Sequence, residues 1–334
     1  MPDIDPWKDN RLCRLLGIQV PVLQAGMYQV AYGELAAAVS GAGGLGVIGA
    51  AFMEPEDLRR EIRLVQKATE RPFGVDILFA RVEGSDPASA GYTGQVQAHL
   101  EVTFEERVPV LVSGLGDPAL VVPRAHGAGM VVMAAVGNTR QARRVVEGGV
   151  DAVIASGHDG GGHVGRVGTI ALVPAVVDAL KDRGTPVAAA GGLADGRGLV
   201  AALALGADGV WLGTRFIATV QARGHDNYKH SIAAIDEEGT VVTRAHSGKP
   251  NRMIRNGFTQ SWEGREAEIK PYPIQMLEVG QPASVLGRIE GDAEHGVLPA
   301  GLSAALVRDV PDAGDVVRQI AAEAESVLKR LVGR

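Results

Sequence analysis

Short apolar runs alternate with amphipathic segments between about residue 20 and residue 220. The runs lack the polar alternation of a half-exposed strand, which is typical of parallel strands covered on both faces. The pattern predicts eight strands, at Val22–Ala25, Gly46–Gly49, Phe73–Leu78, Pro109–Ser113, Met130–Ala134, Ala152–Ala155, Val187–Ala190 and Gly209–Leu212. It predicts helices between them, at Tyr32–Ser40, Glu54–Thr69, Pro118–Ala125, Thr139–Gly148, Val173–Asp182 and Gly196–Leu205. Eight such units favour an α/β fold of the (β/α)8 TIM-barrel type over a doubly wound sheet.

The pattern changes after Ile217. Residues 222–275 are polar and have few long apolar runs, whereas Asp315–Leu331 has apolar residues at helical spacing. We therefore predict a barrel over residues 1–220, an insertion or lid over 221–275, and C-terminal helices over 276–334 that pack on the barrel.

Composition narrows the class of protein. The 334 residues are 46% hydrophobic and 22% charged, which suffices for a sizeable core. The net charge of −6, without a basic stripe, argues against nucleic acid or an anionic membrane as partner. We find no signal peptide and no membrane-spanning run, so we expect a cytoplasmic protein. The single cysteine, Cys13, excludes an internal disulfide, and the histidines show no metal-ligand spacing.

One glycine motif matches a dinucleotide-binding pattern by letters alone. The segment Gly41-Ala-Gly43-Gly44-Leu-Gly46 reads G-x-G-x-x-G, but a predicted helix precedes it and a strand follows. The dinucleotide fingerprint requires the opposite order. A tight helix-to-strand turn is therefore the favoured interpretation, and the order of elements argues against a Rossmann dehydrogenase.

Two glycine motifs occur in the order that anion sites require. Gly191 and Gly192 end the seventh predicted strand, and Gly213 and Thr214 end the eighth. Free N–H groups at such strand ends bind anions, and barrels often hold a phosphate at these two loops. The alternative is that these glycines serve only tight turns. That interpretation is weaker when two adjacent strand ends carry such glycines than when one does.

The loop after the sixth strand combines glycines with titratable groups. It runs from Ser156 through His158, Gly161 and Gly162 to His163. Glycines let a backbone lie close to a ligand, and imidazole is a natural general base near neutral pH. We favour a functional role for His163 over a structural one, while His158 stays open between the two.

Together these segments resemble the nitronate monooxygenase family, formerly called 2-nitropropane dioxygenases, over roughly residues 10–330. The resemblance lies in Pro21-Val-Leu-Gln24-Ala-Gly26-Met27, Gly43-Gly44-Leu-Gly46, Pro72-Phe-Gly74-Val, Asp159-Gly-Gly161-Gly162-His163-Val-Gly165, Ala190-Gly191-Gly192-Leu-Ala-Asp195-Gly196 and Gly213-Thr214-Arg-Phe.

The resemblance implies an FMN-dependent TIM barrel. Gln24, Gly26 and Met27 would lie near the isoalloxazine ring, and His163 matches the base that acts on the carbon beside a nitro group. The remaining glycines would surround the phosphate; they are Gly161, Gly162, Gly191, Gly192 and Gly213, together with Thr214.

Three positions depart from the family pattern. Asp76 stands where Asn is usual, and Ser156 and Trp211 stand where Gln is usual. An ionised Asp only accepts hydrogen bonds, unlike an amide. Because all three departures lie at flavin-ring positions, they weaken the inference that the substrate is a small nitronate.

The basic loop that contains Lys249 and Arg252 has two interpretations. It is either a solvated loop or a lid that binds an anionic substrate, such as a carboxylate or a CoA phosphate.

The leading hypothesis for function is oxidation of alkyl nitronates by FMN and O2, with His163 as base. The alternatives are an enoyl or CoA-thioester reductase or dehydrogenase, an NAD(P)H:quinone reductase, and a non-catalytic FMN-binding protein. A cysteine-dependent barrel enzyme is excluded, since Cys13 precedes the first strand. The partners we expect are a small-molecule substrate and O2, and a homodimer is the assembly we consider.

Overall fold

The computed structural model of the protein describes residues 6–79, 81, 82 and 91–333. Its main feature is a sheet of eight parallel strands in the order β1-β11-β10-β8-β7-β6-β3-β2. The strands are β1 Val22–Gln24, β2 Gly46–Gly49, β3 Phe73–Phe79, β6 Val110–Gly116, β7 Val131–Val136, β8 Ala152–Ser156, β10 Val187–Ala190 and β11 Gly209–Leu212. All eight predicted strands are confirmed, and every residue of β1, β2 and β10 is buried.

The sheet closes into a barrel between its two edge strands, β1 and β2. Leu23 forms a parallel bridge with Leu45, and the backbone N–H of Gln24 donates to Leu45 O at 2.9 Å. The side-chain amide of Gln24 donates to Val47 O at 3.0 Å, and its carbonyl accepts from Val47 N at 3.0 Å. A side chain thus replaces ladder hydrogen bonds at the seam, and the (β/α)8 barrel is confirmed.

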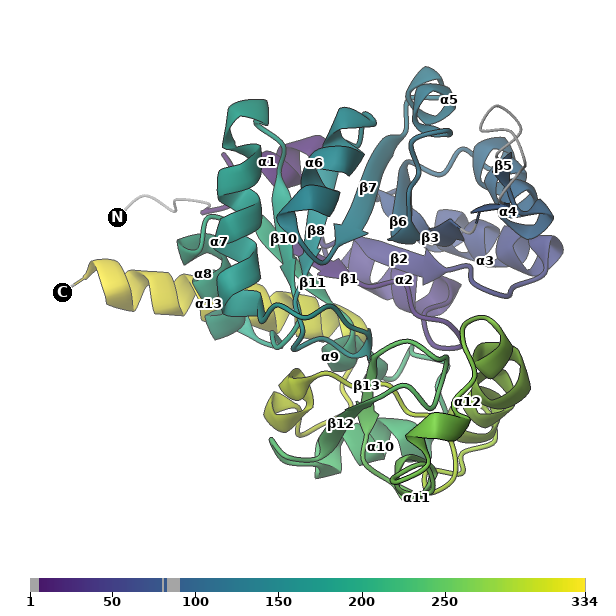
Figure 1. Ribbon diagram of the computed structural model, residues 1–334. Coiled ribbons are helices and arrows are strands. Elements are labelled where there is room, and N and C mark those ends of the chain that lie inside the picture. The colour runs from purple at the N-terminus through teal and green to yellow at the C-terminus, as the bar shows by residue number, and fades with distance from the viewer. Residues whose placement is uncertain (1–5, 80, 83–90, 334) are drawn as a thin grey trace.

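Helices cover the outside of the barrel (Figure 1). They are α2 Gly33–Gly41, α3 Pro55–Ala68, α4 Gly94–Glu105, α5 Val122–Gly127, α6 Thr139–Glu147, α7 Thr169–Leu180 and α8 Gly196–Ala204, with α1 Arg11–Leu16 before β1. The long helix α13, Ala313–Val332, lies against α8 and α2 on the outside of the barrel. Within the described residues, no helix is both long enough and apolar enough to span a membrane.

The turn between α2 and β2 contains the glycines of the rejected dinucleotide pattern. A Cβ atom added at Gly46 would lie 2.0 Å from Ala36 O, and one at Gly44 would lie 2.6 Å from Val22 O. These glycines serve close packing between a helix and a strand, as the order of elements in the sequence indicated.

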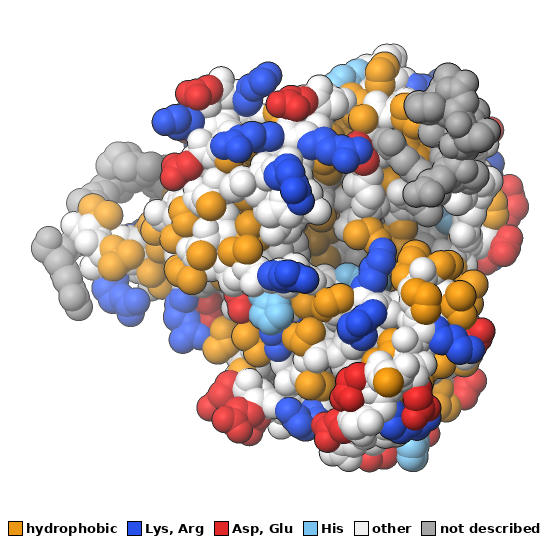
Figure 2. Space-filling model, in the orientation of Figure 1, with side chains coloured by type: hydrophobic (Ala, Val, Ile, Leu, Met, Phe, Trp, Pro, Cys, Tyr) orange, Lys and Arg blue, Asp and Glu red, His pale blue; other side chains and the backbone are white. Residues whose placement is uncertain are grey.

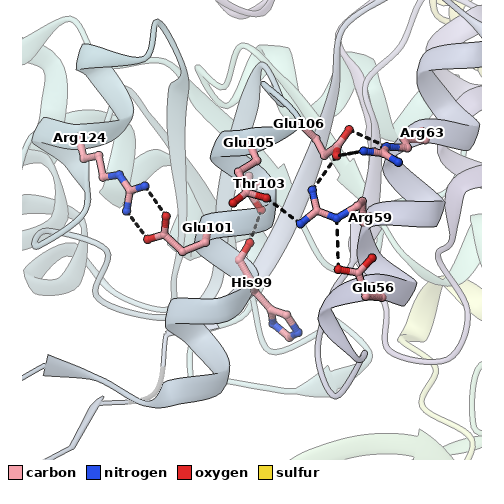
Figure 3. A network of polar contacts seen from close by, with 9 residues as sticks. All are labelled: Glu56, Arg59, Arg63, His99, Glu101, Thr103, Glu105, Glu106 and Arg124. Carbon is pink, nitrogen blue, oxygen red and sulfur yellow. Dashed lines mark hydrogen bonds and ion pairs between the residues drawn. The ribbon is translucent and has the colours of Figure 1, made fainter.

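An ion-pair network joins α3, α4 and α5 on the outer surface (Figure 3). Arg59 of α3 donates to Glu105 and Glu106 of α4 at 2.7 and 2.8 Å. Glu101 of α4 pairs with Arg124 of α5 at 2.5 Å. The network contains no cavity-lining residue, and we regard it as part of the scaffold.

A smaller lobe lies below the barrel in Figure 1 and consists mainly of residues 222–303. It contains β12 Thr240–Thr243, β13 Asn251–Ile254, α10 Asp226–Ala234, α11 Gly257–Gln260 and α12 Gln281–Arg288, with the short helix α9 Thr214–Ile217 at its junction with the barrel. We call this region the cap. It has its own apolar cluster, formed by Ala245, Met253, Phe258 and Val297.

The loop after β8 joins the cap's sheet. Residues Gly162–His163 form a short strand, β9, that pairs antiparallel with β13. His163 lies opposite Asn251, and Gly162 lies opposite Arg252. The polar segment predicted as an insertion or lid is therefore tied to the barrel through the glycine-rich loop. A further pair of short strands, β4 Arg81–Val82 and β5 Gly91–Tyr92, lies between β3 and α4.

Candidate active site

A cavity of about 1000 Å³ lies between the carboxyl ends of the barrel strands and the cap. This volume is at the upper end of the range of about 300–1,000 Å³ for small-molecule sites. Active sites of TIM barrels occur at this end of the strands. Figure 2 shows a hollow between barrel and cap, with Lys and Arg side chains around it. The barrel wall includes Gly26, Met27, Asp76, Ser156, Trp211 and Thr214, all predicted from the sequence.

Four backbone amides form one part of this wall. The N–H groups of Gly192, Leu193, Gly213 and Thr214 donate no hydrogen bond to any described residue. We call this set the amide cradle. Gly191 and Gly192 have φ values of +100° and +74°, and a Cβ at Gly191 would lie 2.9 Å from Gly160 N. Unpaired amides at two adjacent strand ends favour a bound anion.

The N-terminus of α8 contributes nothing to this cradle. Asp195 caps Gly198 N at 3.0 Å, and Glu323 of α13 accepts from Gly196 N at 2.8 Å. These two carboxylates engage the amides at the start of α8, so an anion would not bind there. The amides available to an anion belong to residues just after β10 and β11.

Asp76, at the C-terminal half of β3, is buried against two glycines. A Cβ at Gly26 would lie 2.3 Å from Asp76 Cβ, and one at Gly114 would lie 2.6 Å from Asp76 Oδ1. Oδ1 accepts from Gly114 N at 2.7 Å. Burial raises the pKa of Asp76 to about 8, although the hydrogen bond from Gly114 opposes this. At pH 7 the group is therefore mostly a neutral acid, which donates and accepts as the family's Asn does.

His163 faces the cavity from β9, and its ring is exposed there. Its Nε2 lies 2.8 Å from Ser247 Oγ, which also accepts from Lys249 N at 3.4 Å. Either His163 Nε2–H or the Ser247 hydroxyl can be the donor of this hydrogen bond; we assign Nε2–H as the donor, which places the proton of the neutral ring on Nε2. This assignment leaves Nδ1 unprotonated and with no hydrogen bond to a described residue.

Desolvation and nearby positive charges keep this imidazole neutral. Loss of bulk water around the ring, followed by the charges of Lys249 and Arg288, lowers the pKa of His163 to about 4. Solvent that reaches the exposed ring opposes this lowering, and either way the ring is neutral at pH 7. The neighbouring His246 is buried, and its pKa also falls, to about 3, mainly through burial. Two neutral histidines and two cations thus share this side of the cavity.

Three predicted site residues lie outside the cavity wall. Gln24 is fully buried at the barrel seam. The ring of His158 bonds Gly165 O through Nδ1 at 2.8 Å, and the backbone carbonyl of His158 accepts from Arg252. Arg252 also donates to Thr240 Oγ1 at 3.2 Å. Lys249, in contrast, lines the cavity, together with Gly161, Gly162 and His163.

Sequence reasoning missed three residues of the cap: His246 and Arg288, which line the cavity, and the buried Ser247, which contacts His163. His246 and Ser247 directly precede the Gly248-Lys249 pair that was considered, but nothing local distinguishes them. Arg288 ends α12, about 125 residues from His163, without any recognisable motif. Their roles depend on how the cap lies on the barrel. Within the described chain, no cluster of three His, Cys, Asp or Glu side chains suits a metal ion.

The barrel with a glycine-rich cavity at its carboxyl end and a neutral histidine on the loop after β8 defines a class of barrel oxidoreductases. Comparison with known proteins agrees with this class. A family model for nitronate monooxygenase matches residues 9–323, and the chain belongs to that family.

The relatives carry different activities. A 5-hydroxy-7a-methyl-1-oxo-octahydro-1H-indene-4-carboxyl-CoA dehydrogenase of Mycobacterium tuberculosis is 33% identical, with 94% of this chain and 95% of the relative covered. A probable nitronate monooxygenase of Staphylococcus aureus is 32% identical, with 80% and 84% covered. The solved structure of FabK from Thermotoga maritima superposes with a TM-score of 0.87 at 37% identity, over 97% and 98% of the two chains. The family is therefore clear and the substrate is not.

Proposed function

We propose that the protein is an FMN-dependent oxidoreductase that oxidises alkyl nitronates with O2, with His163 as general base. The observation that carries this proposal is that His163 lines a cavity that also contains the amide cradle, with Nε2 bonded to Ser247 and Nδ1 without a hydrogen bond to any described residue. The family match supports it.

The residues present fit FMN. The amide cradle supplies unpaired N–H groups for the phosphate, and Thr214 is part of it. The wall formed by Gly26, Met27, Asp76 and Trp211 would hold the isoalloxazine ring. FMN, when bound, supplies an electron acceptor beside the reacting carbon.

The chain's own chemistry is proton transfer. We expect His163 Nδ1 to remove a proton from the carbon next to the nitro group, which converts a nitroalkane into its nitronate. The hydrogen bond between Nε2 and Ser247 would hold the ring in position.

The test compares two forms of one substrate. His163→Ala should lower kcat/KM for neutral nitroethane by about 10²–10⁴-fold, the usual contribution of a positioned base. Activity toward pre-formed ethyl nitronate should change far less, because that substrate has already lost the proton. Bound FMN, measured by absorbance, serves as the control for correct folding. Equal losses on both substrates with full FMN content would contradict a base role.

A second function is favoured by the size and charge of the cavity. About 1000 Å³ with Lys249 and Arg288 exceeds the needs of FMN and a short nitronate, and the 94% coverage by a CoA-thioester dehydrogenase points the same way. Rapid anaerobic bleaching of the flavin by NADH or NADPH, or saturable CoA-thioester binding, would favour this reductase or dehydrogenase. The cytoplasmic location and the homodimer stay predictions.

A further inference from the structure

Arg288 is a buried cation that faces the cavity. The residue is 6% exposed, and its side chain makes two hydrogen bonds to described residues, both at 3.3 Å and both to backbone carbonyls, Tyr28 O and Val297 O. Its guanidinium carbon lies 5.7 Å from the centre of the Tyr28 ring. No carboxylate among the described residues pairs with it.

Two other buried arginines of the chain have a carboxylate that balances their charge. Arg215 donates to Asp309 Oδ1 at 2.8 Å, and Arg252 is influenced by the charge of Asp159. Arginine remains charged in proteins, and a buried charge without a partner is costly. The missing negative charge beside Arg288 is therefore expected from a ligand.

The surroundings of Arg288 strengthen this expectation. Lys249, whose ammonium lies 4.1 Å from the centre of the Tyr272 ring, lines the same cavity and has no carboxylate partner among the described residues. The neighbouring histidines, His163 and His246, are neutral and do not balance the charge. Tyr28 and Tyr272 also line the cavity, so two aromatic rings accompany the two cations.

We propose that Arg288 and Lys249 form a binding site for an acidic group, a carboxylate or a phosphate, on the part of the substrate that does not react. This inference rests on the proposed function of the cavity, since it assigns the substrate class: acids rather than neutral alkyl compounds. The site is separate from the amide cradle, which consists of backbone groups of the barrel.

The first experiment measures binding without turnover. The FMN-loaded protein is titrated with propionate, methyl phosphate and the uncharged propionamide, and the flavin spectrum or calorimetry reports affinity. We expect one of the two anions to bind at least tenfold more tightly than propionamide, and the preferred anion identifies the acidic group. Equal affinities for all three compounds would overturn the proposal.

Variants locate the site. Arg288→Gln should weaken binding of the preferred anion at least tenfold, and Arg288→Lys should restore part of it. Lys249→Gln, at an exposed position that tolerates substitution, should weaken it about two- to fivefold. Arg144→Gln is the matched control, because Arg144 lines the cavity but already pairs with Asp117 at 2.9 Å. An anion affinity that falls with Arg144→Gln, but not with the Arg288 and Lys249 variants, would contradict the assignment.

A second experiment separates this site from the reacting group and from FMN. Wild-type enzyme should prefer 3-nitropropanoate to 1-nitropropane, and Arg288→Gln should remove that preference. Equal losses on both substrates would mean that Arg288 binds the nitro group instead, and a variant that loses FMN affinity while riboflavin affinity stays unchanged would assign Arg288 to the cofactor phosphate. If neither compound is turned over, the nitronate function fails, and the binding titration still decides the anion site.

Discussion

The carboxyl group of Asp76 can serve the cavity as a hydrogen-bond donor. One of its oxygens accepts from Gly114 N, and the other has no partner among the described residues. Because the pKa of Asp76 is raised to about 8, that second oxygen carries a proton through most of the neutral range. Below about pH 8, Asp76 can therefore donate a hydrogen bond as the family's Asn does, and above that pH it cannot.

A substitution tests this behaviour. The folded pKa of Asp76 lies above its ordinary value of 3.8, so its stabilising contribution is complete below that value and is lost as pH rises through about 8. Asp76→Asn should therefore raise Tm relative to wild type by an increment that is small at pH 4 and grows toward pH 8. In FMN-loaded protein, the variant should also lose a pH-dependent step in flavin reduction potential near pH 8. A constant Tm difference across this range would argue against a neutral Asp76.

Predicted site residues reach the cavity where the barrel's own strand ends supply them. Asp76, Ser156 and Trp211 were expected beside the flavin ring from the family resemblance, and all three line the cavity. Gln24 has a similar position, but its side chain turns to the neighbouring strand at the seam. A sequence does not indicate which strand pair will form the seam of a barrel, and it gives no sign that Arg288 will reach the cavity from the cap.

At the scale of elements, helix α13 is packed on α8 through a glycine. A Cβ at Gly196 would lie 2.4 Å from Ala324 N and 2.6 Å from Glu323 Cβ. Gly196 N also donates to the Glu323 carboxylate at 2.8 Å. The first turn of α8 thus has room for a hydrogen atom and nothing larger.

Two glycines of α8 form a matched pair for mutation. Gly196→Ala should destabilise the protein by about 1–3 kcal/mol, since overpacking forces the two helices apart. Gly198→Ala should be neutral or stabilising by up to about 1 kcal/mol, because its nearest contact would be 3.4 Å and alanine favours helix. Urea unfolding of both variants measures the difference. Similar stabilities would show that α13 does not pack as described.

Secondary structure was predicted well where apolar periodicity is continuous. Helix α4 was missed because its buried face includes His99 and Thr103. Their polar groups are satisfied locally, His99 by Met53 O at 2.8 Å and Thr103 by His99 O at 2.7 Å. Strands β9 and β13 were missed for another reason: each is short, and β9 exists only because residues far along the chain pair with it.

At the scale of the whole molecule, the cavity connects two bodies with separate apolar clusters. The barrel contributes the amide cradle, and the cap contributes Lys249 and Arg288. A ligand in the cavity therefore contacts both parts. Binding to the folded state alone stabilises it by mass action, by about 2.7 kcal/mol at a ligand concentration of 100 times Kd.

Thermal unfolding tests this arrangement. Excess FMN should raise the Tm of the cofactor-free protein by several degrees. Riboflavin at the same concentration should raise it clearly less, because it lacks the phosphate that the unpaired amides of Gly192 and Thr214 would bind. Equal shifts for the two compounds would contradict a phosphate site at the amide cradle.

The pairing of β9 with β13 also bears on how members of this family can be recombined in the laboratory. The loop after β8 belongs to the barrel by sequence and to the cap's sheet by hydrogen bonding. Grafting residues 222–303 alone from a relative would place a foreign strand and a foreign partner for His163 beside the resident loop. A chimera that retains turnover should therefore carry two separate pieces of chain, the β8 loop of residues 157–168 and the cap, from the same parent. The unit that can be exchanged is discontinuous, although most of the cap is one continuous stretch of the sequence.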